Sequence, residues 1–317
     1  MSFSRFLSVF DYFFVLRPML FIPGWSTMMA GYFIASKGQL FFTPDQFLNL
    51  DFKQIWFLFI VFAAAMGASF LLNQLQDIES DLKNKKLFIL SENHISKTTA
   101  KIEIFLLIIV AIVFAYFINY AVLATVIIFL LITGYAYNYK PFILKDKPFR
   151  SLISNAAMGW LAFAIGWFTT QTAGFSIIAD SLPYLFFNTS LYFFTTLPDV
   201  PGDLKSGKKT LAVIHGTRFV INLALLSYVA GFIMAIILQD WFALIFIIAS
   251  LPFFINMFTK KEVNATIKTT KYAILFFAFA ICLKIPFYFV LMIIIFAFTK
   301  WYFINRFQYN YPNLKGE

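Results

Sequence analysis

Charged residues and the side chains that usually carry metal or redox chemistry are scarce in this sequence. Of its 317 residues only 13% are Asp, Glu, Lys or Arg, against about 25% in an ordinary soluble protein. It contains two histidines and one cysteine, Cys282, which lies in an apolar stretch. A single cysteine excludes an internal disulfide framework and a paired-thiol motif, so we expect Cys282 to be a packing residue.

Hydrophobic residues are in excess, at 61% of the chain, with 45 Phe and a mean hydropathy of +0.80. A helix that spans a bilayer needs about 20 mostly apolar residues, and about nine runs qualify. These runs are 13–36, 54–76, 102–118, 120–139, 151–171, 177–198, 212–238, 241–259 and 271–299. The sequence therefore predicts an all-α polytopic membrane protein that forms one transmembrane domain over residues 1–317.

The last run, 271–299, contains Lys284 and Pro286. Proline lacks the backbone N–H that a continuing helix uses. Because the run is too short for two full spans, we expect a single ninth helix with a kink at Pro286.

Most basic residues fall in four loops that lie on the same predicted side of the bundle. They are Lys83, Lys85, Lys86, Lys97 and Lys101; Lys140, Lys145, Lys147 and Arg150; Lys205, Lys208, Lys209 and Arg218; and Lys260, Lys261, Lys268 and Lys271. The positive-inside rule places these loops and the N-terminus in the cytoplasm. Nine spans then put the C-terminus on the opposite side. The net charge of +10 thus reflects topology, and we expect an integral protein of the cell inner membrane with no nucleic-acid partner.

Asn73, Asp77 and Asp81 follow the second apolar run at intervals of four residues. On a helix each such step turns only about 40°, so the three side chains lie on one face. Glu79 is expected on the opposite face. The simplest interpretation is a solvated helix end, because charged stretches usually face water. The alternative is a site for a cation.

A second acidic stretch, with Asp199 and Asp203, repeats this spacing at the end of the sixth run. Pro198 and Pro201 predict that Asp203 lies on a turn. The recurrence suggests two four-helix halves, about 13–139 and 151–259, followed by the last helix. Such halves place equivalent sites face to face around a central cavity, which favours the cation site over the solvated end.

Four carboxylates at one membrane face repel each other unless a cation lies between them. Mg²⁺ prefers oxygen ligands and shares its coordination shell with substrate phosphates. Asn73, Asp77, Asp81, Asp199 and Asp203 are therefore the candidate Mg²⁺ ligands, with a diphosphate between the two stretches.

These motifs resemble those of the UbiA superfamily of intramembrane prenyltransferases. The resemblance rests on Asn73-x-x-x-Asp77-x-x-x-Asp81, Asp199-x-x-x-Asp203, Arg17-Pro18, Tyr137-Asn138-Tyr139-Lys140-Pro141 and Gly207-Lys208-Lys209-Thr210-Leu211-Ala212-Val213. It covers residues 17 to 213. Many family members have Asn-Asp where this chain has Asn73-Gln74, a departure that we do not expect to abolish metal binding.

The resemblance implies nine helices around a central cavity and Mg²⁺-dependent transfer of a prenyl group from a polyprenyl diphosphate. The four aspartates would be the catalytic residues. Arg17, Lys140 and Lys209 would bind the diphosphate. An arginine inside an apolar span is costly and is usually functional.

The sequence does not identify the acceptor of the prenyl group. A lipophilic aromatic ring of a quinone-type pathway is favoured, and a glycerol phosphate lipid or a porphyrin is the alternative. A secondary transporter and an inactive scaffold on the same fold are the competing classes. Transporters keep ionisable groups near the bilayer midplane, whereas these acids cluster at one face, and four retained aspartates argue against a scaffold.

Overall fold

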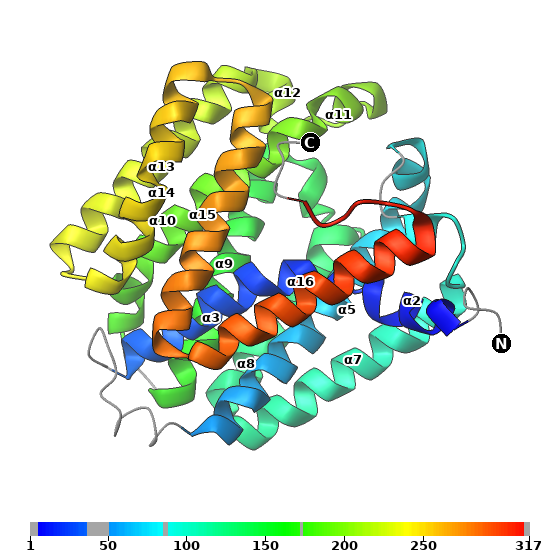
Figure 1. The fold of residues 1–317 in the computed structure, drawn as a ribbon, viewed down its shortest axis with the longest axis horizontal. Helices are drawn as coiled ribbons and strands as arrows, with labels where there is room; N and C mark the ends of the chain where they lie inside the picture. The colour runs from blue at the N-terminus through cyan, green and yellow to red at the C-terminus, as the bar shows by residue number, and fades with distance from the viewer. Residues whose placement is uncertain (1–5, 37–50, 85–87, 172–173, 314–317) are drawn as a thin grey trace.

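The computed structural model describes residues 6–36, 51–84, 88–171 and 174–313, and the regular structure in these ranges is helical throughout (Figure 1). The long helices are α3 (Phe21–Ala35), α5 (Phe52–Asn84), α7 (Lys97–Ile118), α9 (Pro148–Thr170), α10 (Ser176–Thr196), α13 (Thr217–Ile237), α14 (Trp241–Lys260), α15 (Val263–Lys284) and α16 (Pro286–Phe307). Helix α8 (Tyr120–Phe129) continues into the π-helix η3 (Leu130–Ala136). The short elements are η1 (Ser8–Phe10), α2 (Asp11–Phe14), η2 (Pro18–Leu20), α6 (Phe88–Ser91), η4 (Leu144–Asp146), η5 (Leu197–Asp199), α11 (Val200–Ser206) and α12 (Leu211–His215).

The predicted all-helical membrane fold is confirmed. In the described ranges eight helical segments are long and apolar enough to cross a membrane, and residues 120–136 form a shorter apolar one. Helix α10 lies where the run 177–198 predicts it, although polar residues such as Asp180 lower its hydropathy. The division of the chain into two repeated halves stays a prediction.

The prediction of a single kinked helix over 271–299 is wrong. The chain forms two helices of 22 residues, α15 and α16, that are separated by Ile285. Pro286 occupies the first position of α16. A backbone N–H at that position would have no hydrogen-bond partner within the helix, so proline costs nothing there. It therefore begins a new helix, and Figure 1 shows α16 leaving the end of α15 and running at an angle toward α2.

The additional helix α16 also changes the side on which the C-terminal segment 308–313 lies. Tyr309 and Tyr311, which follow α16, line the same cavity as Asp77 and Asp81 at the end of α5. The expectation that the C-terminal segment lies on the opposite side from the acidic stretches is therefore wrong. Helix α16 thus returns the described chain to the side on which α5 ends.

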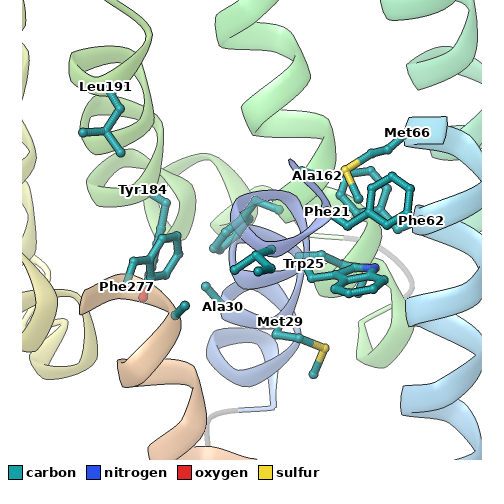
Figure 2. Packing of buried hydrophobic residues seen from close by; sticks show 14 of the residues in the cluster. Phe21, Trp25, Met29, Ala30, Phe62, Met66, Ala162, Tyr184, Leu191 and Phe277 are labelled. Carbon is teal, nitrogen blue, oxygen red and sulfur yellow. The ribbon is translucent and has the colours of Figure 1, made fainter. Parts of the chain in front are cut away.

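Helix α3 lies at the centre of the bundle, between α5, α9, α10 and α15 (Figure 2). Its contact with α9 is backbone against backbone, because a glycine of each helix faces the backbone of the other helix. A Cβ atom on Gly31 would lie 2.0 Å from the carbonyl oxygen of Phe163, and one on Gly166 would lie 1.7 Å from that of Met28. Small residues at such crossings let membrane helices approach closely.

Candidate active site

Helix α5 presents the first acidic stretch. It is 33 residues long, so it continues past the apolar run and carries Asn73, Asp77 and Asp81 on uninterrupted helical turns. All three line one cavity of about 580 Å³. Glu79 is exposed and lies on an adjoining cavity instead, as its place on the helix predicts.

The second acidic stretch comes from the chain after α10. Asp199 and Asp203 line the same cavity as the residues of α5. The prediction of a turn at Asp203 is wrong, because the chain continues as η5 and then as the short helix α11. Pro198 and Pro201 each stand at the beginning of one of these helices, where proline is tolerated.

Arg17 lies between α2 and η2, at a break in the first apolar segment. Its φ of 59° is left-handed, a conformation that is uncommon for a residue with a side chain. The guanidinium lies 5.8 Å from the centre of the Phe70 ring and within electrostatic range of Asp81 and Asp199. Arg17 lines the cavity, so the structure brings it together with the predicted metal ligands.

The lysines at the cavity differ from those predicted. Lys140 and Lys209 are exposed and are not among the residues that line the described cavities at this end. Lys208 lines the main cavity, and Lys145 donates from Nζ to Oδ1 of Asp77 over 2.7 Å. The assignment of Lys140 and Lys209 to a diphosphate stays a prediction without geometric support.

Sequence reasoning missed Lys145 and Lys208 for different reasons. Lys208 is the neighbour of the residue chosen, in the same Gly207-Lys208-Lys209 segment. Lys145 lies on η4, which follows Ile143, a residue with a left-handed φ of 39°. Nothing in the periodicity of the sequence signals the direction that a loop takes after such a residue.

Polar contacts hold the first acidic stretch in place. The amide nitrogen of Asn73 donates to Oδ1 of Asn138 over 2.7 Å, which leaves the Asn73 amide oxygen for a cation. Asn138 in turn donates to the backbone carbonyls of Thr133 and Gly134 in the π-helix η3. Such π-helical turns occur frequently at functional sites.

Gln74, the departure from the family motif, is 2% exposed and donates to the carbonyl of Val15 over 2.8 Å. This hydrogen bond joins α5 to the segment that contains Arg17. Gln74 thus has a structural partner of its own.

The ionisation of Asp81 depends on its neighbours. Burial and the neighbouring Asp77 raise the pKa of Asp81 to about 6, while Arg17, Lys208 and Lys145 oppose this shift. A cation close to Asp81 favours its charged form. The aspartates thus have the chemistry of a cation site.

Within the described ranges, no three carboxylate, histidine or cysteine residues lie close enough together to hold a metal ion alone. This arrangement fits Mg²⁺, which is usually bound through one or two carboxylates with waters and substrate phosphates as its other ligands. Mg²⁺ held between the two stretches would take its remaining ligands from waters and from substrate phosphates.

Comparison with known proteins agrees with this geometry. The profile of the UbiA prenyltransferase family matches residues 24–270. Digeranylgeranylglyceryl phosphate synthase of Sulfurisphaera tokodaii is 28% identical over 225 residues, which are 69% of this chain and 76% of that protein. 1,4-Dihydroxy-2-naphthoate octaprenyltransferase of Bacillus subtilis is 28% identical over 101 residues, or 32% of each chain.

Solved structures share the fold. A UbiA homologue from Archaeoglobus fulgidus bound to DMAPP and Mg²⁺ superposes with a TM-score of 0.65 at 20% identity, covering 86% of this chain and 98% of that one. A homologue from Aeropyrum pernix K1 gives a TM-score of 0.65 at 11% identity with the same coverage. The chain belongs to the UbiA prenyltransferase family and is an integral membrane enzyme of that family.

Proposed function

We propose that this protein transfers a prenyl group from a polyprenyl diphosphate to a lipophilic acceptor within the membrane, and that the reaction depends on Mg²⁺. One observation carries the proposal. Two acidic stretches that are far apart in the sequence line one cavity together with Arg17 and Lys208. Anionic ligands for a cation and cationic partners for phosphate thus meet at one place.

The aspartates and Asn73 are the residues that would hold Mg²⁺. When bound, Mg²⁺ would stabilise the negative charge that develops on the diphosphate as it leaves. Arg17 and Lys208 would stabilise the same charge through their fixed positions. Lys145 neutralises Asp77, so the acidic stretch accepts an anionic substrate with less repulsion.

The rest of the cavity suits the hydrocarbon. Its lining includes the rings of Phe14, Phe88 and Phe303. Apolar walls exclude water from the allylic carbon as its bond to oxygen breaks, and aromatic faces attract the positive charge that forms there. Prenyl transfer needs both conditions, because water would otherwise capture the prenyl group.

The acceptor that we propose is an aromatic ring of a quinone-type pathway, which the aromatic lining supports. A glycerol phosphate lipid is the second candidate, since the relative from S. tokodaii is named for that acceptor. The basic loops support a site that faces the cytoplasm from the cell inner membrane. A transporter is less favoured, because Asp77 and Asp81 lie in the last turns of α5, at one end of the apolar span Phe52–Glu79 and not at its middle.

The test uses membranes that contain the full-length protein. Labelled prenyl diphosphates of several lengths are supplied with an aromatic, a glycerol phosphate lipid or a porphyrin acceptor, and products are identified by mass spectrometry. We expect one acceptor class to be prenylated, with activity lost in EDTA and restored by Mg²⁺. Transfer that is insensitive to EDTA, or no transfer to any acceptor, would contradict the proposal.

A further inference from the structure

Helix α16 lies beyond the part of the chain that matches the family, which ends at residue 270. It nevertheless contributes to the cavity. Thr299 and Phe303 of α16, and Tyr309 and Tyr311 of the segment that follows it, are among the lining residues. One wall of the site is therefore built from sequence outside the family match.

The beginning of α16 is fixed to the centre of the bundle. The hydroxyl of Tyr288 donates to the carbonyl of Ile22 over 2.9 Å and lies 3.1 Å from the hydroxyl of Ser26, both on α3. Its ring stacks on Phe59 of α5 with centroids 5.6 Å apart. Tyr288 is fully buried, so this end of α16 is a structural anchor.

The C-terminal part of α16 is joined to the N-terminal segment. Tyr302 stacks on Phe14 with ring centroids 3.9 Å apart. Asp11, which is 1% exposed, accepts from the hydroxyl of Tyr302 over 2.6 Å and from two nitrogens of Arg306 over 3.1 and 2.9 Å. A buried carboxylate with this many donors holds its neighbours in one arrangement.

The segment 308–313 runs from the end of α16 back toward α15 (Figure 1). Tyr309 donates from its backbone nitrogen to the carbonyl of Phe303, and Lys271 of α15 donates to Oδ1 of Asn313 over 3.2 Å. Both ends of this segment are therefore attached.

Phe303 is the residue at which these contacts meet the cavity. Its ring lies 5.9 Å from that of Phe14, 5.9 Å from that of Phe88 and 5.1 Å from that of Tyr311. Thr299, one turn earlier, is 1% exposed, and its hydroxyl has no hydrogen-bond partner in the described part of the chain. Phe303 and Thr299 thus present a large and a small side chain to the same cavity.

We propose that α16 and residues 308–313 form the wall that selects which prenyl chain the cavity accepts, with Phe303 and Thr299 as specificity-determining residues. The inference rests on the proposed function. The prenyl chain is bonded to the diphosphate, and the diphosphate is held beside the aspartates. The chain must therefore extend along the apolar lining of the same cavity, toward Phe14, Phe88 and Phe303.

The test compares three variants that change the size of this wall. Phe303→Ala enlarges the cavity. We expect it to raise kcat/KM for geranylgeranyl diphosphate, relative to kcat/KM for dimethylallyl diphosphate, by about tenfold or more. In an apolar pocket, space for a single methylene already changes discrimination between substrates by about tenfold or more. Thr299→Leu fills the cavity and is expected to shift the ratio in the opposite direction. Phe298→Ala is the matched control, because Phe298 packs on Phe10, Phe13 and Phe14 from the same helix but does not line the cavity.

Opposite shifts for the two lining variants and an unchanged ratio for Phe298→Ala support the inference. Unchanged ratios for all three, or an equal shift for Phe298→Ala, would overturn it. Phe303→Leu replaces Phe303→Ala if the latter does not accumulate in membranes, with a shift in the same direction expected.

A second measurement separates this inference from the proposed function. Non-reactive thiolodiphosphate analogues of the same donors are tested for the rise in thermal midpoint that binding produces. If the unmodified protein transfers no prenyl group, the proposed function fails. In that case the binding assay tests the role of the wall. A change in the preferred analogue length for Phe303→Ala supports the inference, and an unchanged preference overturns it.

Discussion

The ammonium nitrogen of Lys145 lies 2.7 Å from Oδ1 of Asp77, so a loop lysine is joined directly to the first acidic stretch. Both side chains are largely shielded from solvent, at 12% and 20% exposure, and such pairs are screened less by salt than surface pairs are. Lys145→Met is expected to lower kcat/KM for the prenyl diphosphate by on the order of a hundredfold, because the cation that neutralises Asp77 is lost and the acidic stretch then repels the anionic substrate more strongly. Steady-state kinetics in membranes measure this change.

Lys140→Met is the matched control, since Lys140 belongs to the same loop but is exposed. Its kcat/KM should stay within about twofold of the unmodified protein, as is usual when an exposed charge is removed. A larger loss for Lys140→Met than for Lys145→Met would restore the assignment made from the sequence.

Gly166→Ala should destabilise the contact between α3 and α9. The added methyl group would lie 1.7 Å from the carbonyl oxygen of Met28, so the two helices must separate. We expect a loss of about 1–3 kcal/mol, the usual cost of overpacking, seen as a lower thermal midpoint in detergent. Gly159→Ala in the same helix is the control, because its nearest neighbour would be at an ordinary 3.6 Å. Equal midpoints for the two variants would refute the close contact.

Arg306→Met should destabilise the protein by about 3–5 kcal/mol, because it leaves the carboxylate of Asp11 buried with one of its partners removed. The double variant Asp11→Leu, Arg306→Met removes both charges and should recover much of that loss. Thermal midpoints of the single and double variants measure the difference. A double variant that is no more stable than the single one would mean that Asp11 and Arg306 do not stabilise each other.

The parts of the site that lie on regular helices could be predicted from the sequence. The four-residue spacing of Asn73, Asp77 and Asp81 placed them on one face of α5, and the repeated spacing identified Asp199 and Asp203 as their counterparts. The structure brings all five to one cavity. Helical geometry is regular, so a spacing alone determines a face.

The parts that depend on loops and on helix ends could not be predicted in this way. Lys145 reaches Asp77 because of the backbone direction after Ile143, which no periodicity records. Helix α16 was missed because a long apolar run with one proline is compatible with either one kinked helix or two helices. Tyr311 lines the cavity only because α16 returns the chain to this side.

The proposed function requires the two acidic stretches to form one site. Because residues that act as a unit are not additive, Asp77→Ala, Asp199→Ala and the double variant should each abolish Mg²⁺-dependent prenyl transfer to the same degree. Glu79→Gln, which removes an exposed carboxylate from the same helix, should keep near-normal turnover. The decisive measurement is the rate of prenyl transfer by these four variants in membranes across a Mg²⁺ titration. Near-normal turnover by either single aspartate variant would show that the two stretches do not form one site.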